Sequence, residues 1–142
     1  MTRINLTKVS TLSDQHLMIE YRELPRVLGL LDKHLAKGTK LSVILKGKPT
    51  NYTMGTGHVK FFYDKLVFLK NRHLELVQEL HSRGFSIQYV NPLQIEKYPI
   101  ALQQDYVPTP EAIAISQQRL NEKLAMRPKF YRMHGKLINQ GE

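Results

Sequence analysis

The sequence predicts a mainly α-helical fold in a single domain spanning residues 1–142. Three segments carry apolar residues at the three- and four-residue spacing of an amphipathic helix. Each segment is bordered by residues typical of helix ends. At 142 residues, with 42% apolar and 23% charged residues, the chain has the size and composition of one globular domain with a buried core.

The first predicted helix begins after Ser13, or after Thr11 with Asp14, and ends before Gly38. Its apolar positions define one buried stripe: Leu17, Tyr21, Leu24, Leu28, Leu31 and Leu35. Pro25 lies within this segment. Because the stripe continues in phase beyond the proline, we expect one bent helix of roughly 24 residues with a kink at Pro25 rather than a break.

The polar side of this helix carries one carboxylate, Glu23, beside Arg22 and Arg26. At about 100° per residue the two arginines lie roughly 40° apart, and Glu23 lies about 60° from Arg26. An anion that binds the arginines would therefore lie next to Glu23. From the pattern alone, a surface ion pair is the simpler interpretation of Glu23.

The second predicted helix begins between Val59 and Asp64 and ends at Arg83–Gly84. Its buried face is expected to contain Phe62, Leu66, Leu69, His73, Leu76 and Leu80. His73 is interpreted as a core histidine with a hydrogen-bond partner. The flanking segments are predicted as loops, with a short strand at 40–46 and another at 85–90.

The third predicted helix has Thr109 as its N-cap and Pro110 as its first residue, and it ends at Arg127 before Pro128. Its inner face is expected to contain Ile113, Ser116, Leu120 and Leu124. Arg119 and Lys123 are four residues apart and are predicted to form a basic pair on the outer face.

The tail at 127–136 interleaves aromatic and cationic residues. This mixture suits nucleic-acid contact, with cations for phosphates and rings for stacking. Packing of Phe130 and Tyr131 onto the core is an equal alternative.

The charge balance points to a polyanionic partner. Twenty-one Lys and Arg residues against twelve Asp and Glu residues give a net charge of +9, and nucleic acid is the commonest such partner. The absence of cysteine excludes disulfides and thiolate chemistry. Without a long apolar run or a leader, neither a membrane span nor a signal peptide is predicted, and a cytoplasmic location is expected.

Several long blocks of the sequence closely resemble the pyrimidine-dimer DNA glycosylases of the phage endonuclease V type. The blocks are 1–6, 14–18, 20–27, 57–66, 113–123 and the tail around 135–136. The resemblance implies a compact, mainly helical single domain in which the N-terminal segment is wedged between the first and third helices. No protein partner is implied, and a monomer is expected.

The resemblance also implies an activity on double-stranded DNA that contains ultraviolet-induced pyrimidine dimers. Such enzymes cleave the glycosyl bond of the 5′ base and then break the backbone by β-elimination. The nucleophile implied here is the α-amino group of Thr2, exposed once Met1 is removed. No cofactor and no metal are implied.

Elementary chemistry supports an N-terminal amine in this role. Imine formation needs an unprotonated amine. An α-amino group with a pKa of about 7.7–8.0 is roughly a quarter free base near pH 7.4, whereas a lysine with a pKa of about 10.4 is about a thousandth.

Glu23 corresponds to the family's essential carboxylate, which stabilises positive charge at the sugar and removes the 2′ proton. The positions implied to contact DNA are Arg3, Gln15, His16, Arg22, Arg26, Arg119, Lys123, Lys129, Phe130 and Tyr131. The tail has fewer aromatic rings than the family pattern. We expect this departure to affect lesion affinity and the choice between dimer isomers, and to leave catalysis intact.

Two alternatives remain open on the sequence. One is a basic helical DNA-binding module without catalysis, which explains the charge but gives no role to Thr2 or Glu23. The other is a lyase that acts mainly on abasic sites or oxidised bases, because the same imine chemistry would serve it.

Overall fold

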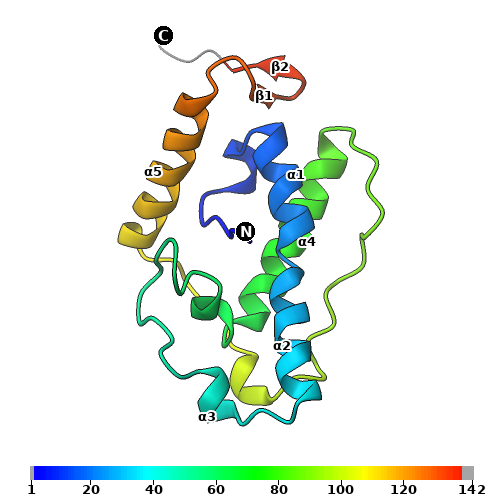
Figure 1. The fold of residues 1–142 in the computed structure, drawn as a ribbon. Helices are drawn as coiled ribbons and strands as arrows, with labels where there is room; N and C mark the ends of the chain where they lie inside the picture. Colours follow the sequence, from blue (N-terminus) through cyan, green and yellow to red (C-terminus); the bar gives the residue numbers. More distant parts are fainter. Residues whose placement is uncertain (1, 139–142) are drawn as a thin grey trace.

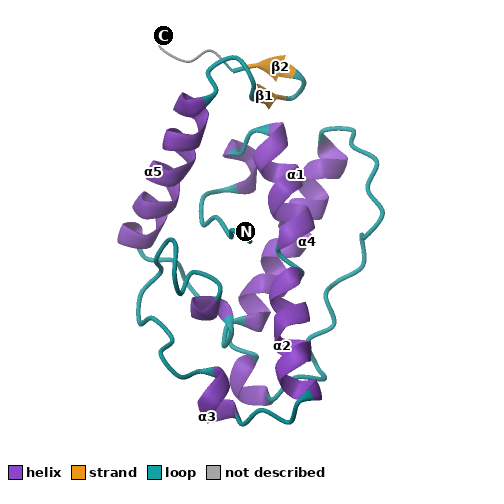
Figure 2. Cartoon of the chain, viewed as in Figure 1, coloured by secondary structure: helices purple, strands orange, loops and turns teal. Residues whose placement is uncertain are grey.

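The computed structural model describes residues 2–138, and about half of them are helical (Figures 1 and 2). In chain order the elements are η1 Val9–Thr11, α1 Asp14–Glu23, α2 Arg26–Ala36, α3 Leu41–Ile44, η2 Lys60–Phe62, α4 Leu66–Ser82, η3 Ile100–Leu102, α5 Pro110–Met126, β1 Arg132–Met133 and β2 Lys136–Leu137. The mainly α fold class is confirmed. Met1, whose removal the resemblance implies, lies outside the described residues.

The predicted bent helix is instead two helices, α1 and α2, separated by Leu24 and Pro25. Pro25 has no N–H to donate, and the Val27 N–H bonds the Leu24 carbonyl three residues back, at 3.2 Å. Leu24 and Pro25 nevertheless keep right-handed helical dihedral angles, so α2 continues in nearly the direction of α1 (Figure 1). The predicted stripe is therefore buried from Leu17 to Leu31 as expected.

The N-terminal segment, residues 2–7, lies between α1 and α5, as the resemblance implies (Figure 1). Asn5 donates to Glu20 of α1 at 2.8 Å, and the Leu6 N–H donates to the Ser116 hydroxyl of α5 at 2.9 Å. Arg72 of α4 reaches the Thr7 carbonyl at 2.6 Å. All three major helices thus contribute to the walls around this segment.

A continuous apolar core joins the helices, with Leu17 of α1, Leu31 of α2, Leu76 of α4 and Leu120 of α5 all buried. The predicted inner face of the second helix is buried in full, from Phe62 to Leu80. Within residues 2–138, no helix is both long enough and apolar enough to cross a bilayer.

The start of α4 and the state of His73 both differ from expectation. Lys65 has non-helical dihedral angles (φ −124°, ψ 45°) and forms a bridge with Gln103, so the regular helix begins only at Leu66. His73 is buried and stacks on Tyr21 with ring centroids 5.6 Å apart. Among the described residues, however, neither of its ring nitrogens has a hydrogen-bond partner.

Both predicted strands are wrong. Residues 41–44 form the short helix α3, because the Val43 and Ile44 N–H groups bond the Lys40 carbonyl instead of a neighbouring strand. Residues 85–90 form an irregular loop, in which the Tyr89 N–H donates to the Tyr21 hydroxyl at 2.8 Å. An apolar run becomes a strand only where another strand lies beside it to accept its backbone hydrogen bonds.

The third predicted helix is confirmed at both ends. The Thr109 hydroxyl accepts from the Ala112 N–H at 3.1 Å, Pro110 is the first helical residue, and Arg127 caps the end. Ser116 and Leu120 are buried as predicted, but Ile113 is 38% exposed and Ala112 takes its inward position.

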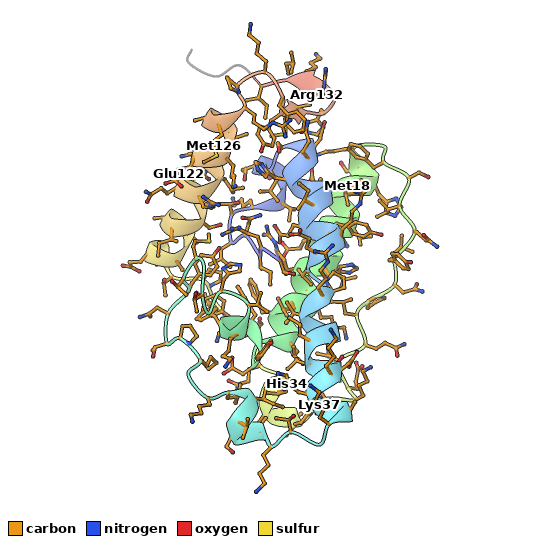
Figure 3. The ribbon with its side chains drawn as sticks, viewed as in Figure 1. Met18, His34, Lys37, Glu122, Met126 and Arg132 are labelled. Carbon is orange, nitrogen blue, oxygen red and sulfur yellow. The ribbon has the colours of Figure 1, made fainter. Side chains whose placement is uncertain are left out.

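The tail forms a small hairpin that the sequence did not predict. β1 and β2 pair antiparallel, and the turn between them is made by His134 and Gly135, both with positive φ. Arg132, labelled in Figure 3, lies in this hairpin above the first turn of α1.

Candidate nucleic-acid interface and active site

A pocket of about 290 Å³ opens between α1, α5 and the N-terminal segment. Its lining residues are Arg3, Asn5, His16, Ile19, Glu20, Glu23, Arg119, Leu120, Lys123 and Tyr131. Six of the twelve residues predicted for the site lie in this list. We refer to it as the Glu23 pocket.

The two carboxylates of this pocket differ in their partners. Glu20 is buried and is held by the Arg72 Nε at 2.7 Å, by the Arg72 Nη2 at 3.1 Å and by Asn5. The Glu23 side chain is 16% exposed and forms an ion pair of 3.5 Å with Arg26, whose own side chain is 59% exposed. Glu20 is therefore committed to the fold, whereas Glu23 faces the pocket beside a cation that solvent also reaches.

Arg3 connects the N-terminal segment to this site. Burial lowers the pKa of Arg3, the neighbouring charge of Arg119 lowers it further, and the charge of Glu23 opposes both effects. Its Nη1 lies 2.9 Å from the Met54 sulfur. Arg3 also lines a second, more open cavity of about 580 Å³ together with Arg119. Thr2, immediately before Arg3, is 8% exposed.

The sequence predicts Arg119 on the outer face of α5, and this prediction is wrong. It lines both cavities with its side chain only 25% exposed, and its Nε is buried without a hydrogen-bond partner among the described residues. Arg119 immediately precedes Leu120, a buried residue of the inner face of α5, and Lys123 follows Leu120 by three residues, which is less than one helical turn. Because the N-terminal segment holds α5 away from α1, cations flanking the inner stripe face the intervening pocket.

Gln15 and His16 bind the C-terminal hairpin. The Gln15 amide donates to the Phe130 carbonyl at 2.8 Å and accepts from the Arg132 N–H at 2.9 Å. The His16 ring stacks on Tyr131 with centroids 4.5 Å apart. Burial, with a smaller contribution from Lys123, lowers the pKa of His16 to about 4, so this imidazole is neutral near pH 7.

Asp14 is a residue of this region that the sequence did not single out beyond its capping role. Its carboxylate accepts from Arg83 at 2.9 Å and from the backbone N–H groups of His134 and Gly135 at 3.1 and 2.8 Å. No local pattern could have revealed this, because the three donors are 69 to 121 residues away. Asp14, Gln15 and His16 together hold the hairpin against the first turn of α1.

Of the two roles that the sequence left open for the tail, packing onto the domain is confirmed for Tyr131, and nucleic-acid contact stays a prediction. Tyr131 is buried against His16 and lines the Glu23 pocket. Phe130 is 39% exposed, with the Arg127 guanidinium 3.6 Å from its ring centroid, and Lys129 is exposed. One ring packs onto the domain, and the rest presents cations and a ring to solvent.

Arg22 lies apart from the Glu23 pocket. It lines a different cavity, of about 630 Å³, with Tyr21, Pro25 and the loop at 86–94. Arg22 is exposed at the rim of that cavity. Of the two arginines beside Glu23 in sequence, only Arg26 is paired with it among the described contacts.

Comparison with known families identifies the family of the chain. A family model described as pyrimidine dimer DNA glycosylase matches residues 1–90. The chain belongs to this family. It is accordingly a DNA glycosylase of pyrimidine-dimer repair, and its substrate is DNA.

The matched residues include Arg3 and Glu23, which line the Glu23 pocket, and Thr2, which is not among its lining residues. The glycosylase completes its pocket with α5 and the hairpin, which lie beyond the matched residues. Within residues 2–138, no group of three or more His, Asp or Glu side chains is arranged to hold a metal ion.

Proposed function

We propose that this glycosylase is bifunctional, with an abasic-site lyase activity that uses the α-amino group of Thr2 as nucleophile. The amine attacks C1′ of the 5′ nucleotide of a cyclobutane dimer in duplex DNA, and the glycosyl bond to the base breaks. The C1′–O4′ bond of the sugar then breaks, O4′ takes a proton, and an iminium forms between C1′ and the amine. The iminium withdraws electrons, a proton leaves C2′, and the 3′ phosphate departs by β-elimination. Hydrolysis of the imine then frees the amine.

The observation that carries this proposal is the different pairing of the two carboxylates. Glu23 is the pocket carboxylate that the fold leaves accessible, and it stands beside Arg26, Arg3 and Arg119. In the proposed mechanism Glu23 stabilises the cationic sugar and accepts the C2′ proton. The amine needs no deep burial to react, because its ordinary pKa is already near neutrality.

The cations of the site are proposed to bind the phosphates on either side of the lesion. Arg3, Arg119 and Lys123 line the Glu23 pocket, and Arg26 forms an ion pair with Glu23. Arg22, which lines a separate cavity, is proposed to contact a phosphate farther from the lesion. The exposed face of the hairpin, with Lys129 and Phe130, extends this basic surface. Because His16 is neutral, its contribution is stacking rather than charge.

Borohydride trapping tests the mechanism. Protein shown by mass spectrometry to begin at Thr2 is mixed with a duplex oligonucleotide carrying one cis-syn dimer and reduced. We expect a stable covalent complex that peptide mapping assigns to residue 2. Protein that retains Met1 is the matched control, because the added residue displaces the amine, and it should trap far less.

Lack of trapping by protein that starts at Thr2 would refute the lyase proposal. Oligonucleotides with an abasic site and with an oxidised base, run in parallel, distinguish a dimer enzyme from a lyase of broader range. Faster processing of the oxidised base than of the dimer would contradict the substrate proposed here.

A further inference from the structure

The N-terminal segment lies outside regular secondary structure, so its backbone polar groups depend on side chains of other elements. Ile4 is fully buried and is held on both sides. Its N–H donates to the His58 Nε2 at 2.9 Å, and its carbonyl accepts from the Tyr52 hydroxyl at 2.8 Å. These two side chains thus determine where the backbone passes two residues after Thr2.

The protonation state of His58 is determined by its two backbone partners. Nδ1 lies 2.8 Å from the Thr53 carbonyl, which can only accept, so Nδ1 carries the hydrogen. Nε2 must then be the acceptor for the Ile4 N–H, and the ring is neutral. Burial lowers the pKa of His58, and Arg3 lowers it further against the opposing effect of the Thr53 carbonyl.

The turn before His58 orients its ring. Gly55 and Gly57 both have positive φ, and a Cβ added at Gly57 would lie 2.7 Å from the Pro49 side chain. The turn therefore depends on glycine at position 57. It delivers His58 into the core, where only 2% of the residue is exposed.

Tyr52 complements His58. It is buried, and its ring meets the His58 ring edge to face with centroids 5.3 Å apart. Burial raises the pKa of Tyr52, so the hydroxyl remains protonated and donates to Ile4. The neutral His58 ring thus accepts from the Ile4 N–H, and the neutral Tyr52 hydroxyl donates to the Ile4 carbonyl.

We propose that His58 and Tyr52 are positioning residues that hold the Thr2 amine in register with Glu23. The segment's next anchors, Asn5 and Leu6, are bound by Glu20 and Ser116. Only the backbone torsions of Thr2 and Arg3 separate the held Ile4 from the amine. We refer to His58 and Tyr52, which bind the two sides of Ile4, as the clamp. The proposal rests on the function proposed above, because the amine that the clamp positions is the nucleophile of that reaction.

Single-turnover borohydride trapping on DNA with a preformed abasic site tests this clamp, because that substrate isolates imine formation from dimer recognition and base loss. Tyr52→Phe removes a single hydroxyl and should fold. His58→Leu removes the acceptor. We expect the trapping rate constant to fall by about 10- to 100-fold in His58→Leu and by less in Tyr52→Phe, as displacement of a reacting group by about 1 Å predicts.

Two further variants separate positioning from general damage to the fold. His58→Gln places an amide oxygen near the former Nε2 and should recover part of the lost rate. His73→Leu makes the same change at another buried histidine, on α4 and without a hydrogen-bond partner among the described residues, and should keep the wild-type rate. Affinity for DNA with a reduced abasic-site analogue should stay within about threefold of wild type in all four variants, because the clamp contributes no phosphate contact.

The outcomes are distinct. If wild-type protein beginning at Thr2 fails to trap, the proposed function falls and the clamp with it. If wild type traps but Tyr52→Phe and His58→Leu trap equally fast, only the clamp is refuted. Equal slowing by His73→Leu, or a parallel loss of DNA affinity, would also refute it, because the effect would then reflect a general disturbance.

Discussion

At the scale of single residues, the site depends on how two carboxylates on one helix are paired. Glu20 and Glu23 are three residues apart on α1, and both line the Glu23 pocket. Arg72 and Asn5 bind Glu20 within the core, whereas Glu23 meets only the largely exposed Arg26 among the ion pairs of the described residues. The same type of side chain therefore has a structural role at position 20, whereas at position 23 it remains accessible to the pocket.

Glu23→Gln should abolish incision while leaving damage binding in place, because the amide keeps the shape but cannot accept a proton. General-base catalysis of this kind contributes about 10²- to 10⁴-fold, so incision of irradiated plasmid should fall by that factor. Gel-shift affinity for dimer-containing DNA reports the binding.

Glu20→Gln is the matched control for this prediction. It leaves Arg72 buried without its counter-ion, and loss of one partner of such a pair costs about 3–5 kcal/mol of unfolding free energy. Urea unfolding should detect that loss, whereas Glu23→Gln should leave stability nearly unchanged. Near-normal turnover by Glu23→Gln would show that Glu23 is not the base.

His16 should make the stability of the protein depend on acid. Its pKa is lowered from the usual 6.5 to about 4 in the folded state, so the unfolded chain binds more protons between these values. The contribution of the neutral His16 ring to the free energy of unfolding is therefore fully present above about pH 6.5 and is lost as the pH falls towards 4. Burial also lowers the pKa of His58 and His73, which contribute in the same direction.

Urea unfolding at several pH values tests this dependence. We expect the free energy of unfolding to decline more gently with acid in His16→Gln than in wild type between pH 6.5 and pH 4. His81→Gln, a substitution at an exposed histidine near the end of α4, should keep the wild-type slope. Identical slopes in all three proteins would contradict the assignment.

At the scale of elements, the first turn of α1 does more than begin a helix. Ser13 caps it by accepting from the His16 N–H at 3.0 Å. Asp14, Gln15 and His16 then hold the hairpin through its backbone and through Tyr131. Because Tyr131 lines the Glu23 pocket, the docking of the hairpin helps to shape the site.

Asp14→Ala should release the hairpin turn. The N–H groups of His134 and Gly135 and the Arg83 guanidinium would lose their acceptor, at a cost of about 1–3 kcal/mol. Hydrogen exchange at residues 134 and 135 should become faster, and affinity for damaged DNA should weaken. Asp105→Ala changes a loop aspartate whose hydrogen bond, among those of the described residues, is with the adjacent Tyr106 N–H, and it should leave both measurements unchanged. Unaltered exchange in Asp14→Ala would exclude this docking role.

At the scale of the whole molecule, the net charge of +9 is spread over the fold, but a few cations converge on the Glu23 pocket. Arg3, Arg119 and Lys123 meet at the Glu23 pocket, and the hairpin adds Lys129 beside it. Lys37, by contrast, lies at the far end of α2 from the hairpin (Figure 3). A duplex bound at the pocket would therefore contact the first group of cations and leave Lys37 in solvent.

Salt dependence of binding distinguishes these two groups. Each phosphate contact contributes about −0.9 to the slope of log affinity against log salt concentration on duplex DNA. Lys123→Ala should make the slope shallower by about one contact, whereas Lys37→Ala should leave it unchanged although the net charge falls equally. Equal effects of the two substitutions would show that binding follows overall charge rather than this surface.

Much of the helical framework was determined by the sequence itself. The stripe from Leu17 to Leu31, the inner face of α4 and the caps Ser13 and Thr109 are all found as predicted. These features are local, because helical periodicity and capping depend on residues within about one or two turns of each other. The sequence also predicts that Pro25 disturbs the first helix. The predicted kink is instead a break between α1 and α2.

Only the tertiary structure decided how the framework is assembled into a site. In the folded chain Arg119 lines the pocket, and Glu20 binds Arg72. Gln15 and Asp14 bind a hairpin more than 100 residues away in the sequence. The fold also brings His58 to Ile4 across 54 residues. Such contacts leave no periodic signal, because they depend on how distant segments pack and not on the spacing of neighbours along the chain.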